Sequence, residues 1–297
     1  MERRALVLGA LACLSWSTVF VLGRLTIREH ATDPVVLGLY RFGLGSAFLT
    51  LLAASRGCGL RRALRAEPWR FLLLGLTGGF GMAFFVFLAL KFTTSVTTQI
   101  IMNSNPVLIV PLSLLIGERV GLCKVAGVVL GVVGCVLTLG GMPAEAVRAV
   151  PGHVTGGVFA ALSGLCWAVY TVAGRGVVRR HGGLTTTTIS AIIGGFCFLV
   201  VSLALGKDII LGWQGAVTGL YIALVPTAFG FTAWYVALEK LPANVLGPLQ
   251  FIVPVGGVAM ALVVLGEALT AAMAAGGVLA LTGVYLSTRQ ARPPKET

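Results

Sequence analysis

The chain has 297 residues, of which 57% are hydrophobic and only 11% are charged, and its mean hydropathy is +0.96. Soluble domains carry about 25% charged residues, so this composition excludes an ordinary soluble fold and predicts an integral membrane protein. The net charge of +12 does not indicate a nucleic-acid-binding protein, because the basic residues occupy short gaps between apolar segments instead of forming one face.

Long apolar segments recur along the whole chain. A helix needs about 20 apolar residues to cross a hydrocarbon layer of about 30 Å. The sequence predicts ten such spans, at residues 4–24, 34–55, 70–90, 95–116, 120–140, 153–174, 185–206, 212–238, 243–266 and 270–289. Arg3 and Arg4 lead directly into the first span with no cleavage site after it, so we expect this span to be retained. The expected fold class is an all-α integral membrane protein with ten transmembrane helices.

The first span has a second copy later in the chain. Residues 10–24 read ALACLSWSTVFVLGR and residues 161–175 read ALSGLCWAVYTVAGR, with seven of fifteen positions identical at an offset of 151. A second match joins LIGER around Glu118 to VLGEA around Glu267. We therefore predict a first five-helix repeat at 1–140, a linker at 141–152 and a second five-helix repeat at 153–297. Because five is odd, the second copy enters the membrane from the opposite side, an architecture typical of secondary transporters.

The lysines and arginines are distributed unevenly between the two predicted sides of the membrane. Sixteen fall on the side that holds both termini and five fall on the other side. This asymmetry predicts that both termini are cytoplasmic. The expected location is a bacterial inner membrane. The six cysteines are scattered singly without metal-ligand spacing, so we expect no disulfide, no metal site and no cofactor.

Several motifs carry a resemblance to a known family. They are a tryptophan in spans one and six, YRF in span two, ALKFTTSVTTQIIMNSNPV leading into LIGER, and ALEKLPANVLGPLQFIVPV leading into VLGEAL. With these motifs the sequence resembles the drug/metabolite transporter superfamily, EamA type, over nearly its whole length. It is also similar to bacterial aromatic amino-acid exporters. The resemblance implies a transporter that moves amino acids across the membrane.

Spans four and nine contain the least membrane-like backbone. Proline kinks a helix and frees a carbonyl, which in a bilayer needs a partner or a water-filled cavity. Polar side chains accompany the kinks, so we predict that they line the substrate cavity: Gln99, Asn103, Asn105 and Gln250. The alternative is that these segments only shape the bundle. Rocking between halves also needs hinges, which we place at Gly78, Gly79, Pro106, Pro248 and Pro254.

Aromatic residues within the spans form a second candidate set. Trp16 and Trp167 are duplicated and lie in the middle of their spans, where they serve either as packing wedges or as an amphipathic wall of the cavity. Further cavity candidates of the same kind are Phe80, Phe84, Tyr170, Trp234 and Tyr235.

Charged residues give few candidates. Arg41 is the only ionisable residue clearly inside a predicted span, so it either attracts a substrate carboxylate or snorkels outward to bond helix ends. Glu118 and Glu267 precede spans five and ten, where a carboxylate caps the positive end of a helix or relays a proton. The remaining acidic residues lie at span ends or in loops, so facilitated movement along a substrate gradient is the expected default. The alternative is coupling to sodium bound by backbone carbonyls at the kinks of spans four and nine.

Together these features predict a secondary transporter. It would export small amphipathic metabolites, first among them amino acids including aromatic ones, by alternating access through a cavity between inverted repeats. The alternatives are an exporter of drugs or nucleotide-related metabolites and a membrane-embedded lipid-modifying enzyme, but no enzyme signature is present, so we expect no enzyme. The expected partners are a small-molecule substrate and the lipid bilayer, with no nucleic acid. The oligomeric state stays open, and a monomer is compatible with the sequence.

Overall fold

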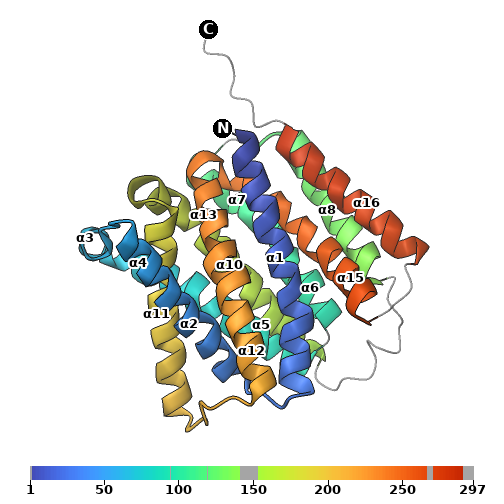
Figure 1. The fold of residues 1–297 in the computed structure, drawn as a ribbon. Helices are drawn as coiled ribbons and strands as arrows, with labels where there is room; N and C mark the ends of the chain where they lie inside the picture. Colours follow the sequence, from blue (N-terminus) through green and yellow to red (C-terminus); the bar gives the residue numbers. More distant parts are fainter. Residues whose placement is uncertain (1, 94, 119, 141–152, 266–269, 290–297) are drawn as a thin grey trace.

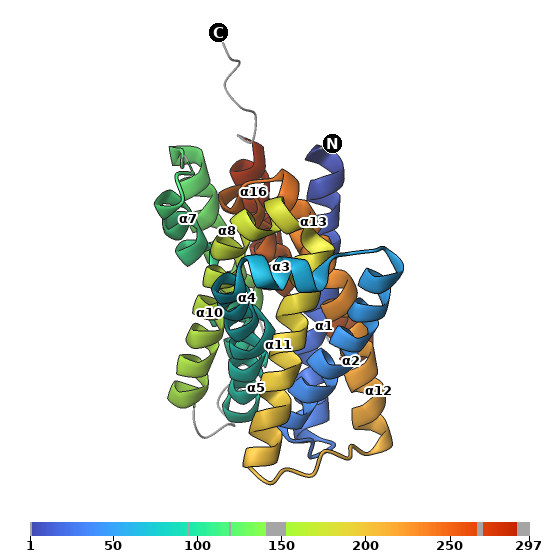
Figure 2. The same cartoon turned by 90° about the vertical axis from the view of Figure 1, so that its left-hand side faces the viewer.

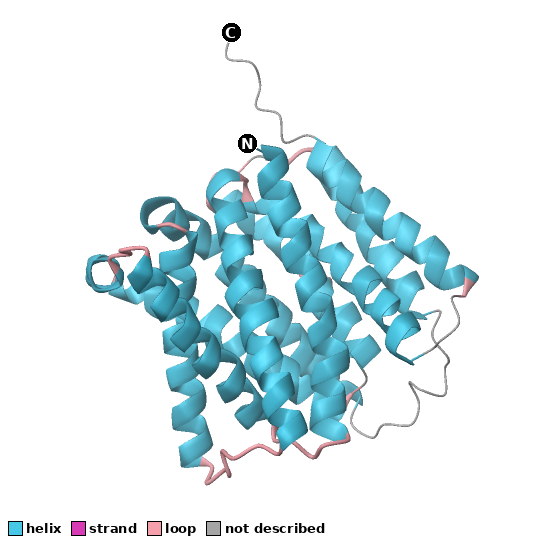
Figure 3. Cartoon of the chain, in the orientation of Figure 1, coloured by secondary structure: helices cyan, strands magenta, loops and turns pink. Residues whose placement is uncertain are grey.

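The chain folds into a bundle of helices, described by a computed structural model over residues 2–93, 95–118, 120–140, 153–265 and 270–289 (Figure 1). Within these ranges every regular element is a helix, which confirms the all-α prediction for the described chain (Figure 3). The bundle begins with α1 (Glu2–Arg28) and ends with α16 (Ala271–Arg289). The start of α1 and the end of α16 lie at the same end of the bundle, which we call the termini end (Figure 1).

Some of the ten predicted spans form helices that are long enough to cross a membrane. Among the described residues, six segments are long and apolar enough to cross a bilayer: Glu2–Arg28, Pro34–Ser55, Pro68–Phe92, Val154–His181, Gly183–Ala204 and Trp213–Lys240. The described residues also contain three shorter apolar helices, at Ile101–Leu115, Leu122–Leu137 and Ala274–Ser287. The total of ten spans and their arrangement as inverted repeats stay predictions. The predicted linker at 141–152 and Glu267 lie outside the described residues.

A short basic helix follows the second span. The span itself, α2 (Pro34–Ser55), starts where the Asp33 carboxylate accepts the backbone N–H of Val35 at 2.8 Å, with proline at its first position. After α2 comes α3 (Leu60–Ala66), which lies across the bundle while its neighbours run along it (Figure 2). Its seven residues are too few to produce a membrane-length signal, so the sequence predicts only a loop there.

Two spans contain a wide π-helical segment in the middle. The third segment of the chain consists of α4 (Pro68–Leu74), η1 (Gly75–Gly81) and α5 (Met82–Phe92). Its later counterpart consists of α12 (Trp213–Ile222), η2 (Ala223–Phe229) and α13 (Gly230–Lys240). Such segments loosen the ordinary hydrogen-bond ladder and often mark functional sites.

Glycine allows η1 to approach its neighbour α11 (Gly183–Ala204) closely. A Cβ atom added to Gly79 would lie 2.2 Å from the backbone oxygen of Ser190 and 3.1 Å from the Cα of Gly194. No side chain fits at that distance. Gly79, a predicted hinge residue, therefore has a packing role between η1 and α11.

Helix breaks occur at the prolines of the fourth and ninth predicted spans. The predicted span 95–116 is two helices, α6 (Ser95–Asn103) and α7 (Pro106–Leu115), because Pro106 starts a new helix. The predicted span 243–266 begins as α14 (Ala243–Leu246), tightens into the 3₁₀ turn η3 (Gly247–Phe251) and continues as α15 (Ile252–Leu265). Segments α7 and η3 contact one another.

Two helices extend beyond their predicted spans. The helix α1 continues past Arg24 to Arg28, and α10 (His153–His181) continues over Arg175, while Lys124 is buried near the start of α8 (Leu122–Gly140). Arg24, Arg175 and Lys124 therefore also lie in helices, but toward the helix ends, whereas Arg41 lies within the apolar span Pro34–Ser55. Basic side chains are compatible with a helix that continues past the apolar layer, so an apolar window alone underestimates its length.

Candidate functional site

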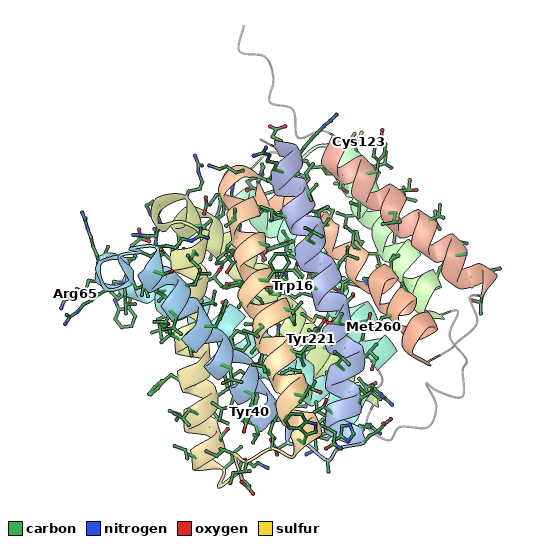
Figure 4. The ribbon with its side chains drawn as sticks, viewed as in Figure 1. Trp16, Tyr40, Arg65, Cys123, Tyr221 and Met260 are labelled. Atoms are coloured by element: carbon green, nitrogen blue, oxygen red, sulfur yellow. The ribbon has the colours of Figure 1, made fainter. Side chains whose placement is uncertain are left out.

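The duplicated tryptophans meet at the centre of the bundle. Trp16 of α1 and Trp167 of α10 pack edge to face with ring centroids 4.9 Å apart. Trp234 lies 5.3 Å from Trp16 and 5.7 Å from Trp167, and Phe231 lies within 5.7 Å of both. Figure 4 shows Trp16 in the middle of the ribbon. These rings join the first helix of each predicted repeat to α13 in one aromatic cluster.

The two duplicated indoles differ in hydrogen bonding. Trp16 Nε1 donates to the backbone oxygen of Pro226 in η2 at 2.7 Å. The Pro226 oxygen lies in the wide π-helical segment η2, where the ordinary hydrogen-bond ladder is loosened, and a buried carbonyl without any partner is costly. Trp167 Nε1 and Trp234 Nε1 have no acceptor among the described residues. Trp16 thus supports η2, whereas the donors of Trp167 and Trp234 are unused.

Arg41 is buried in the same region without a counterion. Only 3% of its surface is exposed, so it does not snorkel outward as one sequence alternative allowed. Its Nε donates to Thr227 Oγ1 in η2 at 2.9 Å. The guanidinium carbon lies 5.2 to 5.8 Å from the ring centres of three phenylalanines, Phe42, Phe87 and Phe231. No carboxylate in the described chain forms an ion pair with Arg41.

A small cavity lies beside these groups. Its walls are apolar apart from one arginine, two amides and the indoles: Trp16, Val19, Phe20, Arg41, Met82, Val86, Met102, Asn103, Trp167, Phe231, Gln250 and Val253. Its open space of about 30 Å³ has room for about two water molecules, not for an amino acid. A substrate of that size therefore requires the surrounding helices to move.

An amide network connects the breaks in the two proline-containing segments. Asn105 Nδ2 donates to Gln250 Oε1 at 3.1 Å, and Asn103 Nδ2 donates to the backbone oxygen of Gln99 at 2.9 Å. Three buried polar atoms of this network have no partner among the described residues: Gln99 Oε1, Asn105 Oδ1 and Gln250 Nε2. The network therefore retains hydrogen-bonding capacity for a polar ligand.

The structure gathers some predicted cavity residues and separates others. Trp16, Arg41, Asn103, Trp167 and Gln250 line the cavity. The other predicted residues do not line it: Phe80, Phe84, Gln99, Asn105, Tyr170, Trp234 and Tyr235.

These separated residues have packing contacts that explain their positions. Phe80 and Phe84 stack on one another at 5.0 Å, and Tyr170 and Tyr235 stack at 4.6 Å. The hydroxyl of Tyr235 donates to the backbone oxygen of Tyr170 at 3.0 Å. An aromatic side chain within a span can pack against other rings or contact a ligand equally well. Residue type alone therefore did not distinguish cavity-lining residues from packing residues.

Ordinary apolar residues were missed by the sequence reasoning. Phe231, Met82 and Met102 line the cavity, yet nothing in their local sequence differs from other membrane-facing positions. Phe231 lies three residues before the predicted cavity residue Trp234 and was not singled out. Only the contacts between distant helices identify it.

The predicted hinge residues occupy irregular parts of the bundle. Gly78 and Gly79 lie in the π-helical η1, Pro106 starts α7, Pro248 lies in η3 and Pro254 lies inside α15. All three prolines are buried. Their role as hinges stays a prediction.

Comparisons with known proteins give a consistent result. A model of the EamA-like transporter family matches residues 3–140 and again residues 154–289. The chain is 28% identical to the aromatic amino acid exporter YddG of Ancylobacter novellus over 97% of this chain and 98% of the relative. It is 27% identical to a probable amino-acid metabolite efflux pump of Salmonella typhimurium over 97% of this chain and 95% of the relative. A solved crystal structure superposes with a TM-score of 0.80 at 27% identity, covering 97% of this chain and 99% of the other.

Proposed function

The chain belongs to the EamA-like transporter family, and on that premise we propose that it exports small zwitterionic metabolites, first among them amino acids including aromatic ones. It is a multi-pass membrane transporter, and relatives along its whole length are named as amino-acid exporters. Transport proceeds by alternating access between two inverted repeats of five helices, 1–140 and 153–297. The double match of the family model supports this division of the chain.

The observation that carries the substrate class is the charge of Arg41, which has no counterion among the described residues. A buried cation without a counterion is expensive in a membrane protein, and such residues mark substrate pathways. A carboxylate that enters the cavity supplies the missing anion. Because no acidic residue is found among the described residues of the cavity walls, an amine without a carboxylate gains no such pairing. Zwitterions are therefore preferred over cations such as polyamines.

The remaining groups of the site fit the rest of an amino acid. The unused amide oxygens of Gln99 and Asn105 offer acceptors for an ammonium group once the network rearranges. The rings of Trp16, Trp167 and Phe231 offer a surface for an apolar or aromatic side chain. The contracted cavity supports alternating access, because a substrate enters only after helices move.

Topology and energy coupling complete the proposal. Both termini lie in the cytoplasm of a bacterial inner membrane, as the excess of basic residues on that side indicates. The protein moves substrate down its gradient without a coupled proton. Proteoliposomes with an imposed pH gradient and equal substrate on both sides test this point, since accumulation abolished by a protonophore would contradict it.

The central experiment is exchange of labelled phenylalanine in proteoliposomes. Arg41→Gln should lower kcat/KM at least about tenfold, because one charge-assisted hydrogen bond contributes about 1.5–3 kcal/mol. Arg41→Lys should retain part of the activity. Thr227→Val is the matched control, since it removes the Nε acceptor but keeps the charge. Equal rates for wild type and a well-folded Arg41→Gln protein would show that Arg41 does not bind substrate.

A further inference from the structure

A second hollow lies at the termini end, away from the central cavity. It is formed between α4, the end of α7 and α10, and its open space is about 390 Å³. We call it the arginine groove, and the residues that matter in it are Arg70, Leu73, Ile116, Val172, Arg175 and Arg179. It combines a basic rim with an apolar wall.

Two of the three arginines of the groove, Arg70 and Arg179, have no close ion-pair partner among the described residues. Arg175 forms an ion pair with Glu118. Arg179 forms no ion pair within the described chain, and the only ion pair of Arg70 is a long one of 3.4 Å to Glu67. Glu67 itself accepts two shorter hydrogen bonds from Arg180, at 2.6 and 2.8 Å. Arg70 and Arg179 are therefore available to a further anion.

The wall of the groove is suited to a hydrocarbon chain. Leu73 is 43% exposed and Ile116 is 47% exposed, and Val172 completes the apolar surface beside them. A small soluble anion would use only the basic rim. An anion with an attached acyl chain uses both the rim and the wall.

We propose that the arginine groove is a binding site for an anionic phospholipid. Its phosphate lies between Arg70 and Arg179, and an acyl chain follows Leu73 and Ile116. Basic pockets between transmembrane helices bind lipid headgroups by this combination of charge and apolar contact.

The neighbouring helix α3 adds to the positive potential at the same membrane surface. Arg61, Arg62 and Arg65 of α3 are exposed, and Arg65 extends away from the bundle in Figure 4. Glu67 is the only acidic residue between Arg56 and Arg70. The site is independent of the substrate cavity, so it holds whether or not the transported solute is an amino acid.

Thermal unfolding of the purified full-length protein in detergent tests the site. Added phosphatidylglycerol should raise the midpoint of unfolding of the wild type, and phosphatidylcholine should not. In Arg70→Gln/Arg179→Gln the phosphatidylglycerol concentration required for half of the shift should rise at least about tenfold. Arg3→Gln/Arg4→Gln is the matched control, because it removes two exposed charges at the same end of the bundle without touching the groove.

Two outcomes of the experiments with the arginine variants and with the soluble headgroup would overturn the proposal. One is an equal loss of the lipid effect in both double variants, which would indicate unspecific attraction by net charge. The other is an equal stabilisation by glycerol 3-phosphate at the same concentration, which would show that the headgroup alone binds and the apolar wall has no role. Leu73→Ser/Ile116→Ser tests the role of the apolar wall separately, and an unchanged lipid titration in this variant would also contradict the proposal.

Discussion

Glu118 and Arg175 form an ion pair across the two predicted halves of the chain. The same carboxylate accepts the backbone N–H groups of Ala243 and Asn244 at 2.9 Å each, so it caps α14. The sequence predicted a cap for the span that follows Glu118, which is wrong, because the N–H groups that it satisfies belong to the second half. Glu118 is also buried, with 9% of its surface exposed, although its position in a loop suggested otherwise. The contact connects three segments at the termini end.

Breaking this connection should show energetic coupling. Glu118→Gln and Arg175→Gln should each lower the free energy of unfolding by about 1–3 kcal/mol, because each leaves a charged group without its partner. The double variant should cost less than the two single losses combined, with a coupling of about 0.5–3 kcal/mol. Denaturant titration of the four proteins measures it. Additive losses would show that the two side chains do not act as a pair.

The two duplicated tryptophans should respond differently to the same substitution. Trp16→Phe leaves the Pro226 oxygen without its donor, which should lower the free energy of unfolding by about 1–3 kcal/mol beyond the packing loss. Trp167→Phe removes an indole nitrogen that has no acceptor in the described chain, so only packing changes. Unfolding of both variants measures the difference directly. An equal effect would mean that the bond to Pro226 contributes nothing.

Pro254 should affect rate more than binding if α15 bends during transport. Pro254→Ala restores a backbone N–H in the helix interior and should stiffen it. We expect a lower exchange rate with an unchanged substrate Kd, measured in proteoliposomes and by ligand-dependent unfolding. Pro111→Ala is the control, because Pro111 also lies inside a helix but is exposed and outside the hinge set. An unchanged rate in well-folded Pro254→Ala would remove Pro254 from the hinge set.

Glu67 should contribute to acid sensitivity. Its hydrogen bonds from Arg180, and then the charges of Arg180, Arg70 and His181, hold its pKa below the usual 4.5 although partial burial acts in the opposite direction. A carboxyl whose pKa is lowered on folding stabilises the protein above its unfolded pKa. That stabilisation is lost as the pH falls through the folded pKa.

Glu67→Gln should therefore weaken the dependence of stability on pH below about 4.5. The measurement is the unfolding midpoint from pH 3 to 7, roughly the range in which carboxyl groups titrate. Asp33 keeps part of the dependence, since burial raises its pKa but the hydrogen bond and charge of Lys207 and the N–H of Val35 lower it overall. Identical profiles for wild type and Glu67→Gln would contradict this assignment.

Part of the candidate site follows from local sequence. Trp16 and Trp167 were identifiable because both copies retain an unusual residue at one offset, and Arg41 because a charge inside an apolar run is rare. The amides Asn103 and Gln250 were identifiable beside prolines. Such signals are local, since a few residues suffice to reveal them.

Other site features depend on which helices meet. Phe231 and Met102 line the cavity only because α13 and α6 face α1 and α10, and no short stretch of sequence contains that information. Phe80 and Tyr235 resembled cavity residues equally well, but the packing of η1 and α13 turns them toward other rings.

The sequence by itself determined the membrane environment, the helical class and the family. Hydropathy and repeat offsets follow from residue order, and transfer into lipid is a property of each segment alone. Only the tertiary structure decided that Glu118 caps a helix 125 residues away, that Trp16 supports the Pro226 carbonyl and that Arg41 has no counterion in the described chain. These relationships are pairings of polar groups in a low-dielectric interior, where each group binds the nearest partner in space, and nearness in space is set by helix packing.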